Sequence, residues 1–286
     1  MSVVKATARA SRVLVISRGA GGMNPELEAK LRQAFADHLV VDFDPNLEYE
    51  TLITSRARVV IAGGDGTIEF VVRRLADSQH PVGIIPLGTF NNLARSLGLP
   101  LEVDDAIKVA RSGRARSITL GRVNDHVFVE VCAIGLFGET IALGDAAKDM
   151  AFGELGDRLK DVMAAKRFEY ELTGDLEGSG SAMSLVFSNT SSIGSLMAVG
   201  DNTPINLSLE FSVYAGRTRT DIVARALASA LLMKHKEDGT AQVFRFSNLH
   251  VKTKPRVRVY ADNIHIGRTP ATISAVVSAL KVLMPK

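Results

Sequence analysis

The chain reads VVIAGGDGTIE from Val59 to Glu69, and this stretch decides how the first part of the chain folds. Four apolar residues, Val59 to Ala62, predict a short strand that is buried on both faces. Apolar residues then recur at helical spacing from Ile68 to Leu75, so a helix with one buried face is expected. The glycines between strand and helix let the backbone turn sharply and approach an anion without a Cβ in the way.

The same alternation of strand and helix extends to both sides of this stretch. Val13–Ile16, Leu39–Val41 and Val82–Ile85 are short apolar runs that predict strands. Asn24 and Pro25 match the N-cap and first residue of a helix between the first two runs. Strands separated by helices predict a doubly wound, parallel α/β sheet.

The pattern changes after about residue 117. Successive strand-like runs without intervening helices indicate an antiparallel sheet or sandwich, with a polar, glycine-rich loop over Gly174–Ser181. Helices are expected only at Asp157–Lys166 and Asp221–His235. The expected strands are Ile118–Glu130, Phe168–Leu172, Met183–Ser188, Leu207–Tyr214, Val243–Phe246 and Leu249–Tyr260. We therefore expect an α/β domain over residues 1–117, joined by a returning segment at 272–286, and a β-rich domain over 118–271.

Composition excludes several classes of protein. The 286 residues carry a net charge of +3 with 6% aromatics and no tryptophan, which argues against a dedicated nucleic-acid binder. No apolar run reaches the ~18–20 residues of a transmembrane helix, and we recognise no secretory signal. The single cysteine, Cys132, excludes an internal disulfide and fits a reducing, cytoplasmic setting.

One run of basic residues stands out near the C-terminus. Lys252, Lys254, Arg256 and Arg258 alternate with other residues, so on one continuous strand they would share a face. Such a face suits a membrane or a phosphate, and equally an ordinary solvated strand surface.

The glycine-rich turn at Gly63–Thr67 predicts an anion site. Backbone N–H groups at the start of the following helix would point at a phosphate, and the helix dipole would favour it. Asp65 would repel phosphate, so its expected task is to hold Mg²⁺ or to accept a proton from an attacking hydroxyl. The alternative is a tight turn in which Asp65 merely caps the helix.

A second polar element follows the next expected strand. Thr89 and Asn91 lie within Leu87–Arg95 and could hydrogen-bond a phosphate or a purine. Parallel strands bring both loops to the same carboxyl edge of the sheet, where α/β proteins bind ligands. The alternative is a helix start capped by Thr89.

Taken together, these motifs resemble the diacylglycerol kinase-like lipid kinases, a family that includes sphingosine and ceramide kinases. The resemblance rests on GGDGT at 63–67, PLGTFNNLARSLGLP at 86–100, VNDHVF at 123–128 and AIGL at 133–136. NAD kinases and 6-phosphofructokinases have similar glycine-aspartate loops, but the GT-x-N-x-x-A-R-x-L-G pattern favours the lipid branch.

The resemblance implies a two-domain kinase with ATP in the cleft between an α/β nucleotide-binding domain and a β-sandwich-like lipid domain. It implies transfer of the γ-phosphoryl group to a lipid hydroxyl, with Asp65 as catalytic residue and Mg²⁺ holder. The lipid would be met at a membrane surface by a cytoplasmic protein, and a homodimer is compatible with the sequence. The implied nucleotide-binding residues are Gly63, Gly64, Asp65, Gly66, Thr67, Ile68, Glu69, Thr89, Asn91 and Asn92.

Some positions depart from the family pattern. Asn92 replaces an aspartate of many bacterial members, and the matching region of a structural Mg²⁺ site in some members has only Glu210. Near the C-terminus, Ile264 stands where the family usually has the glutamate of Asp-Gly-Glu; it cannot accept a proton. His265 is adjacent, but strand alternation sends it to the opposite face. Two hypotheses follow: a lipid kinase that relies on Asp65, or a nucleotide- or lipid-binding protein with impaired catalysis. A third is an NAD kinase-like enzyme.

Overall fold

The computed structural model describes residues 9–139, 166–193, 197–198, 201–214 and 243–286. The chain divides into two compact units, residues 1–118 with 278–286, and residues 119–277. The expected helix at Asp221–His235 lies outside the described residues, as does all of Asp157–Lys166 except Lys166.

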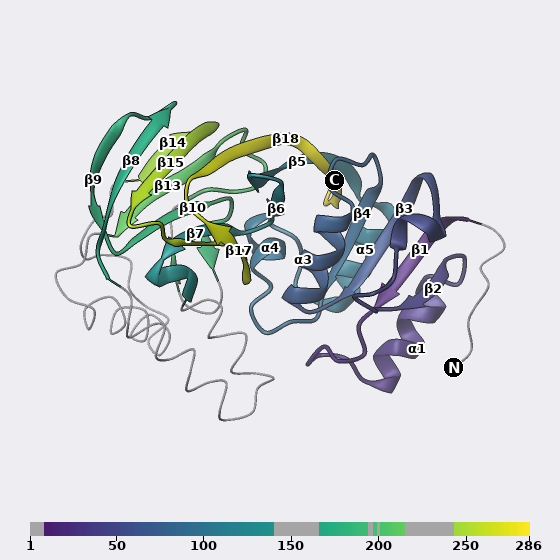
Figure 1. The fold of residues 1–286 in the computed structure, drawn as a ribbon. Helices are drawn as coiled ribbons and strands as arrows, with labels where there is room; N and C mark the ends of the chain where they lie inside the picture. The colour runs from purple at the N-terminus through teal and green to yellow at the C-terminus, as the bar shows by residue number, and fades with distance from the viewer. Residues whose placement is uncertain (1–8, 140–165, 194–196, 199–200, 215–242) are drawn as a thin grey trace, which may run out of the picture. The chain divides into compact units, whose positions relative to one another are not determined.

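The first unit is built on a parallel sheet, as the alternation of strands and helices predicted (Figure 1). Val13 lies beside both Leu39 and Val59, and Val59 lies beside Val82, so the apolar runs pair with one another in register. The last part of β18 (Ala271–Met284) adds to this sheet in parallel, with Val282 beside Val82. The strand order is β2 (Leu39–Asp42), β1 (Ala10–Ile16), β3 (Ile53–Gly63), β4 (Pro81–Pro86) and β18.

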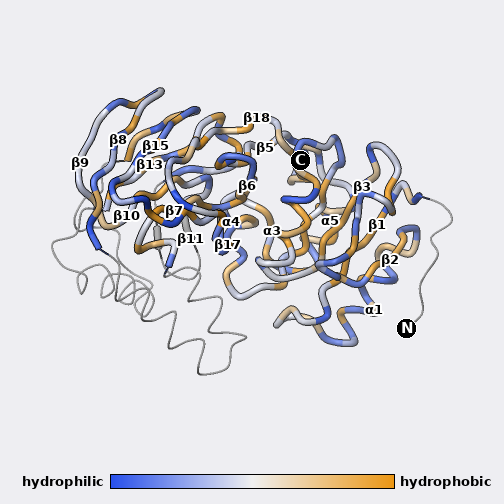
Figure 2. The backbone as a smooth tube through the Cα atoms, viewed as in Figure 1, coloured by the Kyte–Doolittle hydropathy of each residue, from blue (hydrophilic) through white to orange (hydrophobic). Residues whose placement is uncertain are grey.

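Helices cover this sheet because each has one apolar face. Asn24 caps α1 as expected, since its Oδ1 accepts a 2.8 Å hydrogen bond from the backbone N–H of Leu27. Figure 2 shows hydrophobic colouring along β1 and β3, where buried residues pack against apolar side chains of α1 and α5. The helices are α1 (Pro25–Ala34), α2 (Tyr49–Leu52), α3 (Asp65–Arg74), α4 (Asn92–Ser96) and α5 (Val103–Ser112).

The second unit is made of antiparallel strands, so the predicted fold class is confirmed. One sheet has the order β14 (Val243–Phe246), β13 (Leu209–Tyr214), β10 (Ser184–Ser188), β7 (Val131–Gly135), β16 (Arg258–Ala261) and β17 (Ile264–Arg268). Other strands pair as β18, β15 (Asn248–Lys254), β8 (Phe168–Gly174) and β9 (Gly178–Ala182). β5 (Arg114–Val123) pairs with β6 (His126–Phe128), and β11 (Ser192–Ile193) with β12 (Met197–Ala198).

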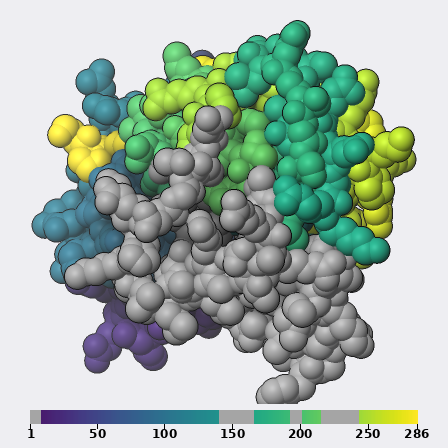
Figure 3. All heavy atoms as spheres, turned by 90° about the vertical axis from the view of Figure 1, so that its left-hand side faces the viewer, coloured from purple at the N-terminus to yellow at the C-terminus, as the bar shows by residue number. Residues whose placement is uncertain are grey.

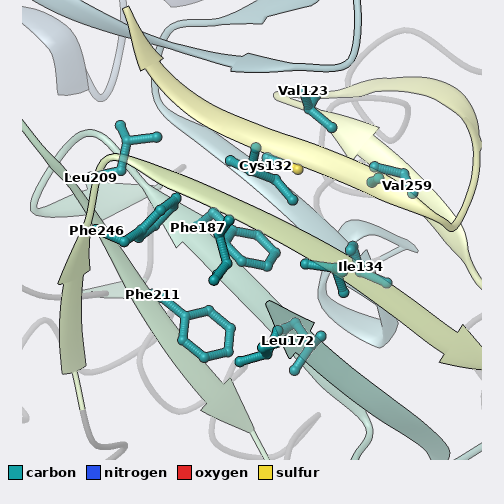
Figure 4. Close-up of a cluster of buried hydrophobic side chains, with 14 of the residues drawn as sticks. Val123, Cys132, Ile134, Leu172, Phe187, Leu209, Phe211, Phe246 and Val259 are labelled. Atoms are coloured by element: carbon teal, nitrogen blue, oxygen red, sulfur yellow. The ribbon is translucent and has the colours of Figure 1, made fainter. Parts of the chain in front are cut away.

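A shared hydrophobic core joins the strands of the second unit (Figure 4). Ile134 of β7 and Phe187 of β10 contribute from one sheet, and Leu172 of β8 from the other strands. Phe187 and Phe211 stack with their ring centroids 5.0 Å apart. Cys132 is fully buried in this core and is therefore a packing residue, as its apolar surroundings in the sequence suggest.

Three sequence-based boundaries in this unit are wrong. Ile118–Glu130 is a hairpin of β5 and β6, because Asn124 takes up a left-handed conformation (φ 51°) that turns the chain. The second half of Gly174–Ser181 belongs to β9 (Gly178–Ala182), which pairs with β8. Leu249–Tyr260 is two strands, β15 and β16, that belong to different sheets. Proline at 255 has no N–H to continue a strand ladder, so the basic residues on its two sides do not share one strand face.

Within the described part of the chain, no helix is long and apolar enough to cross a membrane.

Candidate functional site

Loops from β1, β3 and β4 meet at the carboxyl edge of the parallel sheet in the first unit. The backbone N–H of Leu87 donates to the carbonyl of Gly63 (2.8 Å), and that of Gly22 donates to the carbonyl of Leu87 (3.2 Å). Ser17, after β1, donates its N–H to the carbonyl of Ala62 (2.9 Å). The expectation that the two polar elements meet at this edge is therefore confirmed.

Asp65 is the first residue of α3, one position after the N-cap residue Gly64. Its Oδ1 accepts a 3.0 Å hydrogen bond from the backbone N–H of Asn92, so its carboxylate links the loops after β3 and β4. No side chain caps this helix, which makes the interpretation of Asp65 as a helix cap wrong. The carboxylate is half-buried and is held in place by a residue 27 positions away.

Gly88 explains why the two loops can approach each other. A Cβ at this position would lie 2.6 Å from Oδ2 of Asp65 and 3.0 Å from the backbone nitrogen of Asp65. It would also lie 3.0 Å from Oδ1 of Asn91. A side chain at position 88 would therefore displace the carboxylate, whereas glycine leaves it in place.

Asn91 shapes the second loop. It adopts a left-handed conformation (φ 53°), and its side-chain amide donates to the carbonyl of Gly88 and accepts from the N–H of Gly88, both at 2.9 Å. Asn92 begins α4 and is 5% exposed. Thr89 is exposed and precedes the helix by three residues, so the alternative in which it caps the helix is wrong.

The remaining residues of the glycine-rich stretch divide into packed and open positions. Thr67 and Ile68 are buried, and a Cβ on Gly63 would lie 2.9 Å from side-chain atoms of Thr67. Glu69 is half-buried and lies 4.0 Å from Arg73, measured between Oε2 and Nη2. Gly66 is exposed, and a Cβ there would have nothing within 4 Å. Space for a ligand at this turn is therefore found at Gly66.

Sequence reasoning did not select the loop after β1. Ser17 is 8% exposed and lies against Gly63, and Gly22 approaches the carbonyl oxygen of Leu87 so closely that a Cβ would lie 3.2 Å from it. Their position after the first parallel strand was the available signal, because all parallel strands end at the same edge.

The carboxylate of Asp65 has the chemistry of a magnesium ligand. Among the described residues, no group of three or more His, Cys, Asp or Glu side chains could hold a metal ion. Mg²⁺ in nucleotide sites is commonly held by one or two carboxylates together with phosphate oxygens and water. Asp65 could supply one such carboxylate. Glu210 in the second unit is buried and accepts a 3.1 Å hydrogen bond from the N–H of Asp201, a structural role.

The hairpin between β16 and β17 contains the segment that departs from the family pattern. Asp262 is buried and accepts hydrogen bonds from the backbone N–H groups of residues 129, 130 and 131 at 3.0, 2.9 and 3.1 Å. Ile264 is 44% exposed and pairs with Ala261, whereas His265 pairs with Tyr260, with 5.3 Å between the ring centroids. Ile264 and His265 thus pair with different residues of β16, and both side chains are exposed.

A hollow of about 1020 Å³ in the second unit lies on the sheet face of β15, β8 and β9. β8 and β9 form the teal-green surface at the right of Figure 3. Glutamates from β8 and lysines from β15 line the hollow. This polar lining does not suit acyl chains.

Comparison with known proteins gives consistent matches. Residues 19–123 match the family model described as diacylglycerol kinase catalytic domain. The chain is 30% identical over 243 residues to a diacylglycerol kinase of Mycobacterium tuberculosis (strain ATCC 25618 / H37Rv), covering 80% of this chain and 77% of that protein. It is 28% identical over 239 residues to a diacylglycerol kinase of Bacillus subtilis (strain 168), covering 80% and 78%. A crystal structure of a putative diacylglycerol kinase from Bacillus anthracis shares the fold, with a TM-score of 0.73, 20% identity and 96% of each chain covered.

Proposed function

Because this chain belongs to the diacylglycerol kinase family and is thus a kinase, we propose that it transfers the γ-phosphoryl group of ATP to the hydroxyl of a diacylglycerol-like lipid. The relatives named above are diacylglycerol kinases, and they align with most of this chain. In this proposal ATP is the co-substrate, and the lipid is met at a membrane surface by peripheral contact.

The observation that carries the proposal is the position of Asp65. Its carboxylate is held by the N–H of Asn92 at the carboxyl edge of the sheet, directly beside the open backbone at Gly66. The N-terminal N–H groups of α3, a helix of ten residues, have no side-chain cap. Uncapped N–H groups at a helix start favour a phosphate, so the triphosphate is proposed to lie along Gly63–Thr67.

Asp65 has two proposed tasks, both at its carboxylate. Among the described residues, Oδ2 has no hydrogen-bond donor, whereas Oδ1 is bound by Asn92. The free oxygen would hold Mg²⁺, which neutralises charge on the phosphates when it is bound. The same carboxylate is also the proposed acceptor for the proton of the attacking hydroxyl. Asn92 orients it through a fixed backbone bond.

The nucleotide-binding set that we propose extends from this carboxylate to both neighbouring loops. Thr89 is exposed and can reach a ligand with its hydroxyl. The side chain of Asn91 fixes the backbone at Gly88, and the backbone N–H of Asn92 holds the Asp65 carboxylate. The buried residues Thr67 and Ile68 can contribute through their backbone N–H groups. In this proposal the Asn91 side chain shapes its loop, and the Thr89 hydroxyl and the backbone N–H groups meet the phosphates.

A second candidate function is favoured by Ile264. An exposed aliphatic side chain at the hairpin position cannot accept a proton, and Asp262 beside it is occupied by three backbone N–H groups. General-base assistance contributes roughly 10²–10⁴-fold to a rate. If no other residue supplied a general base, the protein would bind nucleotide or lipid but would transfer phosphate poorly.

The test is a phosphoryl-transfer assay with labelled ATP, Mg²⁺ and a panel of diacylglycerol, monoacylglycerol, ceramide and phosphatidylglycerol. We expect labelled lipid from the wild-type protein and a loss of about 10²-fold or more in Asp65→Asn. Asp105→Asn, a change of an exposed acid that pairs with Lys108 on α5, is the matched control and should keep its activity. Absence of labelled lipid under conditions in which a related kinase works would overturn the catalytic proposal.

The same assay separates the alternatives. Binding of ATP without turnover, measured by calorimetry, would support the non-catalytic candidate. Labelled NADP from a reaction with NAD would support an NAD kinase-like enzyme, which the family relationship disfavours.

A further inference from the structure

A second, smaller pocket of about 240 Å³ lies in the second unit, and its lining is strongly basic. It is formed by the end of β7, the start of β8, the turn between β15 and β16, and the last residue of β17. Its ionisable lining residues are Lys166, Arg167, Arg256, Arg258, Arg268 and Glu139.

The single acid of the pocket is already engaged by two neighbours. Oε1 of Glu139 accepts a 3.2 Å hydrogen bond from Arg258, and its Oε2 accepts a 2.7 Å hydrogen bond from the phenol of Tyr260. Burial, together with this hydrogen bond, raises the pKa of Tyr260, so the phenol remains a neutral donor. In the described part of the chain, neither Arg256 nor Arg268 has a carboxylate within ion-pair distance.

Backbone carbonyls hold these two arginines in place. Nε of Arg256 donates to the carbonyl of Thr269 (2.5 Å), and Nη1 of Arg268 donates to the carbonyl of Arg256 (3.0 Å). Thr269 is fully buried, and its hydroxyl accepts a 3.0 Å hydrogen bond from the N–H of Val257. Neutral acceptors orient both guanidinium groups without neutralising them. The two terminal nitrogens of Arg256 make no hydrogen bond within the described chain.

We propose that this pocket binds one phosphate group, either as free phosphate or as the headgroup of a phosphomonoester lipid. The planar guanidinium groups of Arg256 and Arg268 can each donate two hydrogen bonds to phosphate oxygens. A phosphate dianion would also offset the repulsion among the cations that line this one pocket. A volume of 240 Å³ is below the roughly 300–1,000 Å³ that encloses a drug-sized ligand, so it suits a headgroup rather than a whole nucleotide.

The residues that line the pocket are different from the residues that are proposed to carry phosphoryl transfer. Those residues all lie in the first unit, and every described lining residue of the pocket lies in the second. Within β16, Arg258 stands at the pocket end, and Ala261 stands at the other end, next to the hairpin with Asp262. The phosphate-binding proposal therefore does not depend on kinase activity.

The test measures binding by titration calorimetry on the full chain, without ATP. The probes are inorganic phosphate and a short-chain, water-soluble phosphatidate. We expect Arg256→Gln/Arg268→Gln to weaken binding at least tenfold, and Arg256→Lys, which keeps the charge but loses the fork, to give a smaller loss. Lys252→Gln removes one exposed charge of β15 outside this pocket and is the matched control. Thermal unfolding of each variant checks that it is folded.

The outcomes separate the sources of the phosphate. Equal arginine-dependent binding of both probes identifies a site for free phosphate, and tighter arginine-dependent binding of the phosphatidate identifies a lipid headgroup. If neither probe binds, or if binding is as tight in the folded double variant as in the wild type, the pocket is not a phosphate site.

Discussion

Replacing Gly88 with alanine perturbs the contact between the two loops that position Asp65. The added Cβ would lie 2.6 Å from Oδ2, whereas ordinary carbon–oxygen contacts begin at about 3.3 Å, so the carboxylate must withdraw by about 0.7 Å. It cannot rotate away freely, because Oδ1 accepts the hydrogen bond from Asn92. The backbone nitrogen of Asp65 would also lie only 3.0 Å from the new methyl group.

The expected effect of this substitution is on catalysis more than on folding. A misplacement of about 1 Å in a catalytic group can cost about 10²-fold in rate. With Asp65 in its proposed role, we therefore expect kcat/KM for ATP to fall by about 10- to 100-fold. Overpacking a close contact costs about 1–3 kcal/mol, which thermal unfolding would register as a modest decrease in Tm.

The matched control for Gly88→Ala is Gly178→Ala. Position 178 is exposed on β9 of the second unit, and a Cβ there would meet nothing within 4 Å. Activity of this variant should remain within about twofold of the wild type, since no neighbour must move. If Gly88→Ala also kept kcat/KM within twofold and its Tm unchanged, the argument that this close approach fixes the Asp65 carboxylate would be refuted.

Three further outcomes are expected. Asn24→Ala removes the acceptor for the N–H of Leu27 and should lower the free energy of unfolding in urea by about 1 kcal/mol. Asp262→Ala leaves three buried N–H groups without an acceptor, at a cost of about 1–3 kcal/mol each. The free energy of unfolding in urea should therefore fall by about 3 kcal/mol or more. A decrease below about 1 kcal/mol would contradict the assigned structural role. Burial raises the pKa of the Cys132 thiol, so iodoacetamide should label it at pH 8 only after unfolding. Since the folded state favours the protonated thiol, this group's contribution to stability should decrease as pH rises above its usual pKa.

Local patterns were sufficient for the parallel strands of the first unit and for α1 and α3, but they did not indicate α2 or α5. The apolar runs around residues 13, 59 and 82 are buried strands because such strands read as continuous apolar segments. Asn24 predicts the start of α1 because its capping hydrogen bond is made to a residue only three positions further along the chain. The second unit was harder to predict from local patterns, since Asn124 and Pro255 interrupt runs that look continuous in composition.

The candidate site was only partly visible in the sequence. The glycines at 63, 64 and 66 indicate a turn that can meet an anion, and parallel strands imply a shared edge. The sequence did not show that Asp65 accepts from the N–H of Asn92, or that Ser17 belongs to the same edge. These contacts depend on strand register and loop geometry.

The sequence by itself determined the alternation of strands and helices in the first unit, the glycine-rich turn and the family resemblance, because these are encoded in residue spacing over short stretches. The tertiary structure decided which groups share a site. It alone joins Asp65 to the loop at Gly88, and it alone gathers Arg256 and Arg268 with residues about a hundred positions earlier into one pocket. The physical reason is that such sites are made by contacts between distant segments of the chain. Hydrophobic periodicity indicates which face of a helix or strand is buried, but it does not indicate which other segment that face will contact.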